Sequence, residues 1–442
     1  MDWTVLAHGV GNAEDLPIPR DLAVAGAVAA LVVSFTVLAL AWRAPRFAAA
    51  TGRPVPGWLG RLADSTALRW AARGFGLAFL AFFLYAAVLG QDVLINPAFR
   101  MFYIALWVGI VPASLLLGSF YRAVSPVRTL HLLIARVAGA DPAEGLYRYP
   151  ERLGMWPAAA GLLAFVWFEL VFPGYNQLGP VRLWVVTYLV LTVFGGVLWG
   201  ERFFARADPF EVFSTLVGRL SVWARDDEGR LVVLSPLAHL ARTPVTPGLL
   251  AVVAVLFGST SYDSFRESPL WTGFVTGYDG GVPTPVLSTL ALLGFCVGVG
   301  LVFVAACAAT GVREGSSRWV LSARFAHSLV PIVVGYFVAH YLSLFVEDGQ
   351  TLVIQLSDPL STGSNLLGTA DLSVNYWLTL HPTFLANVKV LGVVLGHVLG
   401  AVAAHDRALE LLPRRHQLTG QLSLLVVMVL FTAGGLLLLF AA

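Results

Sequence analysis

Long apolar stretches alternate with short polar segments, most of them rich in arginine, along nearly the whole chain. Each stretch approaches the roughly 20 residues that a helix needs to cross a ~30 Å hydrocarbon layer. The shorter alternating segments of a membrane β-barrel are absent from the sequence, and lipid leaves helices as the other spanning structure. The pattern predicts an all-α integral membrane protein, a single polytopic domain over residues 1–442, with about ten transmembrane helices at residues 21–42, 75–91, 101–120, 155–172, 183–200, 247–262, 285–309, 325–346, 389–405 and 421–441.

Composition excludes two other classes of protein. Of the 442 residues, 57% are hydrophobic and only 12% are charged, and the mean hydropathy is +0.77. Soluble globular domains carry about 25% charged residues. A disordered chain needs low hydrophobicity and high net charge. The sequence therefore indicates neither a soluble nor a disordered protein.

The basic residues indicate an orientation in the membrane. If the N-terminus lies outside the cytoplasm, most of the 28 Lys and Arg residues fall in the cytoplasmic loops, as the positive-inside rule requires. Both termini are then expected to be extracytoplasmic, in a cytoplasmic (inner) membrane. The formal net charge of +2 averages two opposite faces, so the expected partner is the lipid bilayer and no nucleic acid is expected.

Residues 73–220 contain a repeated pattern. Ser125-Pro126 and Asp208-Pro209 stand 83 positions apart, each after a pair of predicted spans. Ser or Asp at an N-cap followed by Pro is a favourable helix start. We predict a duplicated unit made of a transmembrane hairpin and an amphipathic helix on the cytoplasmic surface. Residues 346–388 are predicted to form an extracytoplasmic cap loop, since a long connection is usually functional.

Ionisable residues inside the predicted spans are the candidate functional groups, because such groups are costly in lipid. They include Asp263, His340, Glu347 and His397. His340 and Glu347 share one stripe of a helix. If Lys389 reaches the outer interface, His397 lies at nearly the depth of His340. The predicted helix that carries His397 also presents small residues that allow a neighbouring helix to approach closely, namely Gly392, Gly396 and Gly400.

These positions suggest a site near the outer face. Imidazoles and a carboxylate are ligands for zinc or copper, so we expect His340, His397 and Asp263 as metal ligands and name Glu347 with them as catalytic candidates. His8 would add an amine and an imidazole if the mature chain began there; an ordinary outer tail is the alternative. Two further interpretations stay open: histidines that only hydrogen-bond between helices, and two haems, each held by a pair of histidines, with His340 and His397 as the outer pair and His327 and His405 as the inner pair.

Several segments resemble a bacterial family of polytopic membrane proteins labelled fenitrothion hydrolase-like. The resemblance covers nearly the whole chain and is carried by His8–Pro19, Thr260–Phe265, Ala339–Gln350, Asn365–Ala370, Gly396–Val398 and Ala404–Ala408. It implies a bacterial membrane protein able to hydrolyse an organophosphate triester, an apolar small-molecule substrate. A metal could lower the pKa of a bound water for this reaction. The alternatives are a transporter or metal-handling permease, and a structural or haem-binding membrane subunit.

Overall fold

The computed structural model describes residues 13–311, 317–413, 416–417 and 419–441. Within them nearly all regular structure is helical, which confirms the all-α prediction. The chain forms two compact units. Unit 1 comprises Met1–Ala50, Leu240–Leu344 and Tyr376–Ala442, and unit 2 comprises Thr51–His239 and Phe345–Asn375.

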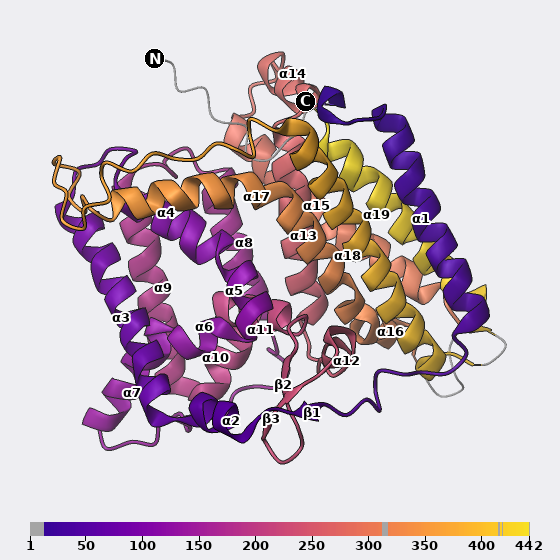
Figure 1. Cartoon of the computed structure of the whole chain (residues 1–442), viewed down its shortest axis with the longest axis horizontal. Helices are drawn as coiled ribbons and strands as arrows, with labels where there is room; N and C mark the ends of the chain where they lie inside the picture. The colour runs from indigo at the N-terminus through magenta and orange to yellow at the C-terminus, as the bar shows by residue number, and fades with distance from the viewer. Residues whose placement is uncertain (1–12, 312–316, 414–415, 418, 442) are drawn as a thin grey trace. The chain divides into compact units, whose positions relative to one another are not determined.

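Unit 1 is a bundle of long apolar helices. Figure 1 shows α13, α15, α18 and α19 running side by side, with α1 packed against α18 and α19. The last part of α17, from Phe345, belongs to unit 2. The elements are η1 (Ala13–Asp15), α1 (Arg20–Ala41), α13 (Leu249–Arg266), α14 (Pro269–Thr276), α15 (Thr284–Ala308), α16 (Arg318–Phe325), η3 (Ala326–Leu329), α17 (Val330–Gln355), α18 (Pro382–Leu411), η5 (Thr419–Gln421) and α19 (Leu422–Leu439).

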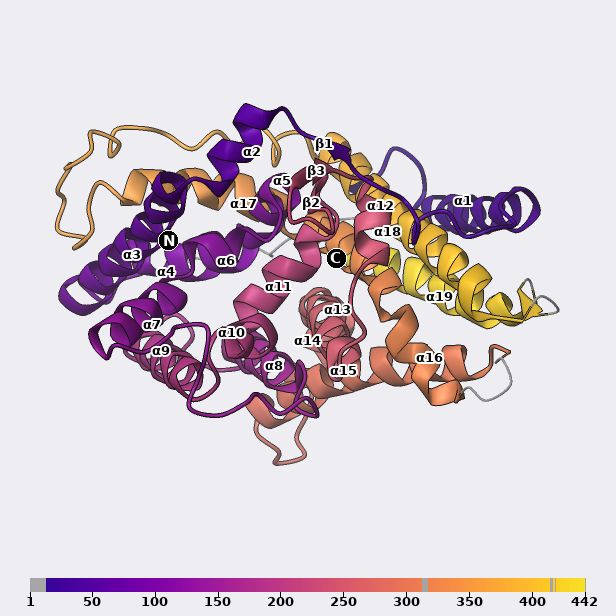
Figure 2. The same ribbon diagram turned by 90° about the horizontal axis from the view of Figure 1, so that it is seen from below.

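In unit 2 the short helix α11 packs against α5, α6, α8 and α10 (Figure 2). A small antiparallel sheet in the order β1-β3-β2 also belongs to this unit. The elements are β1 (Arg53–Pro54), α2 (Gly57–Asp64), α3 (Thr66–Leu89), α4 (Pro97–Arg100), the π-helical η2 (Met101–Val108), α5 (Ile110–Leu117), α6 (Phe120–Val124), α7 (Pro126–Val137), α8 (Trp156–Leu170), α9 (Leu178–Trp199), α10 (Glu201–Ala207), α11 (Pro209–Gly218), β2 (Trp223–Arg225), β3 (Leu231–Val233) and α12 (Pro236–Ala241), which straddles the unit boundary.

Seven described helices are long and apolar enough to cross a membrane, and an eighth is obtained if the bent pair Pro97–Val108 and Ile110–Leu117 counts as one span. The pair bends by 42°. Helix α8 has 15 residues, about 22 Å at 1.5 Å per residue, which is shorter than a hydrocarbon layer. The chain is therefore compatible with a multi-pass membrane protein, while the number ten stays a prediction.

Both helix starts expected in the repeat are present. The Ser125 side chain caps α7 by accepting from the Arg128 backbone N–H at 3.3 Å. Asp208 caps α11 in the same way. The expected surface position differs for α11, because nine of its ten residues are buried. A helix that is apolar on all sides belongs in an interior rather than at a lipid surface.

The segment expected as a cap loop at residues 346–388 is partly helical. Helix α17 continues to Gln355 and α18 begins at Pro382, so the irregular part covers residues 356–381. Within unit 2, Arg100 donates from Nε to Asp348 at 2.7 Å and from Nη1 to Gln355 at 3.1 Å. These contacts hold the end of α17 against α4 and help to explain why the helix extends beyond the apolar stretch.

Candidate functional site

Helix α13 carries a run of small polar residues into the interior of unit 1. Ser259, Thr260, Ser261 and Ser264 are all buried. The hydroxyls of Ser259, Thr260 and Ser261 each donate to a backbone carbonyl three or four residues earlier, which satisfies these three groups within α13. The polar run therefore remains helical and brings Asp263, one residue before Ser264, into the bundle.

Asp263 and His340 meet directly. His340 Nε2 lies 2.9 Å from Asp263 Oδ2, and the two residues are 0% and 2% exposed. Tyr341 donates its hydroxyl proton to the same carboxylate oxygen at 2.7 Å. Arg266 Nε lies 3.1 Å from the other oxygen, Oδ1. The predicted association of Asp263 with His340 is thus present, and Tyr341 and Arg266 are partners that the sequence reasoning missed.

The second imidazole nitrogen is hydrogen-bonded to a serine. His340 Nδ1 lies 3.1 Å from Ser264 Oγ, and the Tyr336 hydroxyl donates to that same Oγ at 2.8 Å. Ser264 Oγ can alternatively donate to the Thr260 carbonyl at 3.4 Å. Asp263, His340, Ser264 and Tyr336 therefore form one continuous chain of hydrogen bonds between α13 and α17.

This chain satisfies either protonation state of His340. When the imidazole is neutral, Nε2–H donates to Asp263 and Nδ1 accepts the Ser264 hydroxyl proton. When the imidazole is protonated, Nδ1–H donates to Ser264 Oγ, and the hydroxyl turns its own proton to the Thr260 carbonyl. Unsatisfied polar groups are costly in an apolar interior. Because the Ser264 hydroxyl can rotate, neither protonation state of His340 leaves a buried hydrogen-bond donor without an acceptor.

His397 has a different environment. Its Nδ1 donates to the Val393 carbonyl at 2.8 Å, whereas its buried Nε2 has no hydrogen-bond partner within the described residues. The predicted glycine face is confirmed, since a Cβ on Gly335 of α17 would lie 2.5 Å from the Gly392 carbonyl oxygen. Close helix packing is therefore the observed role of this face.

The three-ligand metal site is not assembled. Among the described residues, no group of three His, Cys, Asp or Glu side chains is arranged to hold a metal ion. Asp263 and His340 supply two ligand types, and His397 does not join them in such a group. Glu347 lies on α17 in the stretch that belongs to unit 2, and His8 lies outside the described residues. A metal ligand set cannot be predicted from helix depth alone, because each helix's rotation decides where an imidazole points.

The inner histidines and Lys389 also take specific positions. His405 has hydrogen-bond partners at both ring nitrogens, namely Gln421 Oε1 and the Trp42 carbonyl, each at 2.9 Å. An imidazole engaged at both nitrogens has none free to ligate haem iron. Lys389, expected at the outer interface, is only 3% exposed. His405 therefore links α18 to η5 and to the residue that follows α1.

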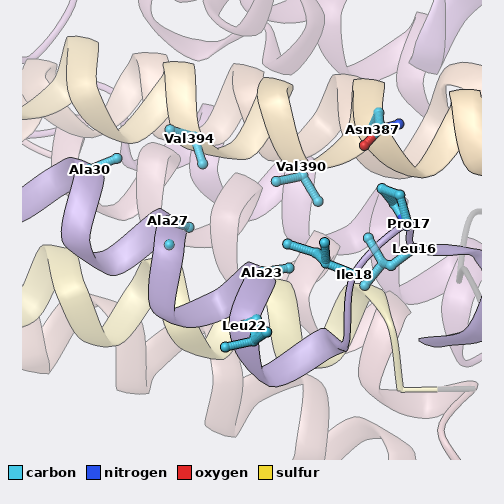
Figure 3. A pocket seen from close by; sticks show the side chains of 11 residues that line it. Leu16, Pro17, Ile18, Leu22, Ala23, Ala27, Ala30, Asn387, Val390 and Val394 are labelled. Carbon is cyan, nitrogen blue, oxygen red and sulfur yellow. The ribbon is translucent and has the colours of Figure 1, made fainter.

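A pocket of about 250 Å³ lies between α1, the segment before it and α18 (Figure 3). Asn387 supplies a side-chain amide, and the other lining residues are apolar or glycine: Leu16, Pro17, Ile18, Leu22, Ala23, Gly26, Ala27, Ala30, Val390 and Val394. Apolar walls of this kind suit a hydrocarbon group. The lining offers no ionisable group, so the pocket is not the place for acid–base chemistry.

Unit 2 contains a second buried ionic group that the sequence reasoning did not select. Arg128 donates to both carboxylate oxygens of Glu211, at 2.5 Å from Nε and 2.8 Å from Nη2. Their side chains are 11% and 2% exposed. Arg128 and Glu211 are 83 positions apart, which is the interval between the two helix caps. Arg128 and Glu211 thus occupy equivalent positions in the two copies of the repeated pattern. The 83-residue interval in the sequence could therefore have been used to predict this pair.

No protein-family model, no curated protein and no solved structure matches this chain significantly.

Proposed function

We propose that this chain is a multi-pass membrane transport protein in which the Asp263–His340 pair binds and releases a proton. The observation that carries the proposal is the hydrogen-bond chain from Asp263 through His340 to Ser264 and Tyr336. It accommodates both protonation states of the imidazole without leaving a donor unsatisfied. Chains of Asp, Glu and His within membrane helices are typical of proton relays in pumps and transporters.

The position of the pair supports the same function. Asp263 and His340 are almost completely buried. Burying ionisable groups costs folding free energy, and such residues within membrane proteins usually have a function. Arg266, whose side chain is 22% exposed, contacts Asp263 Oδ1 from one turn along α13. The carboxylate is thus linked to the edge of the unit on one side and to the imidazole on the other.

Hydrolysis of a phosphotriester, which the family resemblance implies, has less support. Ser264, His340 and Asp263 form a serine–histidine–carboxylate series, but Ser264 and His340 are 0% exposed. A nucleophile must come within about 3–3.5 Å of the reacting atom, and a fully buried hydroxyl cannot do so without opening of the bundle. A proton, in contrast, moves along hydrogen bonds and needs no such opening.

Proton flux into proteoliposomes tests the proposal. A potassium gradient with valinomycin would impose a membrane potential, and an enclosed pH-sensitive dye would report proton entry. We expect the wild-type protein to conduct protons faster than protein-free vesicles. Asp263→Asn and His340→Gln should each reduce the flux to the protein-free level, because each removes one protonatable group of the pair.

Asp279→Asn is the matched control, since Asp279 is an exposed aspartate in the same unit and should leave the flux unchanged. Wild-type flux equal to that of empty vesicles would overturn the proposal, as would full flux in Asp263→Asn. Hydrolysis of a nitrophenyl phosphotriester by the purified wild-type protein, absent in His340→Gln and without proton flux, would replace transport with the hydrolase interpretation.

A further inference from the structure

Asp208 lies inside unit 2 at the start of α11 and is 0% exposed. Its Oδ1 accepts from the backbone N–H groups of Phe210 at 3.1 Å and Glu211 at 3.4 Å. The Tyr188 hydroxyl donates to the same oxygen at 3.0 Å. One oxygen of this carboxyl group therefore performs the whole N-cap function, as expected of Asp at such a position.

The other oxygen, Oδ2, is buried and has no hydrogen-bond partner within the described residues. A carboxylate oxygen without a partner in an interior is expensive, because its hydration is lost and nothing replaces it. A proton on Oδ2 removes the charge and leaves the cap at Oδ1 intact. Burial, followed by the negative charge of Glu211, raises the pKa of Asp208 to about 7, against a smaller lowering by the Tyr188 hydroxyl.

No cation is hydrogen-bonded to Asp208 within the described part of unit 2. Arg128 directs its hydrogen bonds to Glu211 and to the Glu201 carbonyl. The Tyr121 hydroxyl lies 3.0 Å from that of Tyr188 and extends the hydrogen bonding away from the cap. Among the helices packed against α11, α5 has no ionisable residue, whereas α8 carries Glu169, α6 carries Tyr121 and Arg122, and α10 carries Glu201, Arg202 and Arg206.

The matching position in the repeat sharpens the argument. Ser125 caps α7 with a hydroxyl and cannot ionise near neutral pH. Both helices need a cap, and serine meets that need at one of them. The aspartate at the other position supplies the same cap together with a second oxygen, which the cap does not use.

We propose that Asp208 Oδ2 is a proton-binding site, separate from the Asp263–His340 pair and independent of the proposed transport function. In the protonated state the acid is neutral, with its proton on Oδ2 and its cap bonds on Oδ1. Loss of that proton to water places a full negative charge at the N-terminus of α11, between Tyr188 and the Arg128–Glu211 pair. The ligand of this site is a proton, and its release changes the charge buried in unit 2.

Infrared difference spectroscopy of the purified full-length protein tests this site. The carbonyl band of a protonated carboxylic acid is separate from the carboxylate bands, and spectra would be recorded from about pH 5 to about pH 9. We expect an acid band that converts to carboxylate with a midpoint near 7. Asp208→Ser should abolish it while keeping a helix cap, because it copies Ser125.

Two further variants keep the test decisive. Asp227→Asn, at an exposed position of the β2–β3 turn, should leave the band unchanged. Tyr188→Phe should shift the midpoint upward, because the carboxylate loses a hydroxyl donor. The proposal is overturned if Asp208→Ser and wild type give the same titration, or if the wild-type acid band is absent throughout the range. The Tyr188→Phe shift is a second readout if Asp208→Ser does not fold.

Discussion

Asp263 in unit 1 and Asp208 in unit 2 are the same side chain in opposite circumstances. Both are almost completely buried on helices with apolar surroundings. Asp263 has the His340 imidazole and the Tyr341 hydroxyl on one oxygen and Arg266 beside the other. Asp208 has three donors on one oxygen and none on the other within the described residues. The two residues are almost equally buried, so the difference lies in their partners. Asp263 has donors at one carboxylate oxygen and the Arg266 guanidinium beside the other, whereas Asp208 has donors at one oxygen only, among the residues described, and therefore favours its protonated form.

The two units also use buried charge differently. In unit 1 the carboxylate, imidazole and two hydroxyls form a chain in which a proton can change position. In unit 2, Arg128 and Glu211 form an ion pair with two parallel hydrogen bonds, a geometry that fixes the orientation of the two side chains relative to each other. Asp208 stands beside this fixed pair, so its protonation changes the local charge without breaking the pair.

Removal of Asp263 should have the largest effect on stability. Asp263→Ala takes the acceptor away from His340 and Tyr341 and leaves Arg266 without this contact. Breaking a buried pair by deleting one partner typically costs about 3–5 kcal/mol. Denaturant unfolding of the purified protein in detergent micelles would measure the loss. Asp279→Ala, at an exposed position of unit 1, should change stability by less than about 0.5 kcal/mol. Equal unfolding curves for the two variants would show that the Asp263 contacts contribute nothing.

Asp208→Asn should have an intermediate effect that depends on pH. The pKa of Asp208 in the folded protein, about 7, is above the ordinary value of 3.8. The proton therefore stabilises the fold below about pH 4, and this stabilisation is lost as the pH rises to about 7. Asparagine keeps the cap oxygen and never ionises. The free energy of unfolding of the variant should therefore rise relative to that of the wild type across this range, by about 1.4 kcal/mol for each unit by which the pKa of Asp208 is raised on folding, and the difference should level off at higher pH.

Thermal unfolding of both proteins at several pH values between about 4 and 8 would record this difference. A constant difference between wild type and Asp208→Asn at every pH would contradict a titrating Asp208. The exposed substitution Asp227→Asn provides the baseline, because its effect should be small at each pH.

The smallest effects compare the two tyrosines that donate to these carboxylates. Tyr341→Phe removes the donor to Asp263 Oδ2, and Tyr188→Phe removes the donor to Asp208 Oδ1. We expect losses of about 1.5 and about 1 kcal/mol, since hydrogen bonds to a charged acceptor are the stronger ones. The Tyr188→Phe loss should grow as the pH rises through 7, whereas the Tyr341→Phe loss should stay level there. If the loss of stability changed with pH in the same way in both variants, the proposed distinction between Asp208 and Asp263 would be wrong.

Much of the local structure could be predicted. Continuous apolar stretches led to the helices of unit 1, and Ser125-Pro126 and Asp208-Pro209 led to the starts of α7 and α11. Asp263 and His340 could be selected because each is an ionisable residue in an apolar segment. Their association was expected as part of the proposed ligand set, and the rotation of α13 and α17 does turn these two side chains toward each other.

The same reasoning was insufficient for His397 and for α11. His397 has a suitable depth, but its Nδ1 is bound to its own helix and it forms no metal group with the other two residues among those described. Helix α11 begins at the expected proline, yet it is enclosed by α5, α6, α8 and α10 rather than lying on a surface. Depth and amphipathicity describe one helix at a time and contain no information on its neighbours.

What the sequence by itself determined is the helical, membrane-compatible character of the chain, the capped helix starts and the few ionisable residues placed among apolar ones. Hydropathy and capping depend on consecutive residues, so they can be evaluated without the fold. Only the tertiary structure decided that Arg128 meets Glu211, that Ser264 joins His340 and that Asp208 keeps one oxygen without a partner. Hydrogen bonds are short and directional, so these outcomes depend on the rotation and packing of helices far apart in sequence.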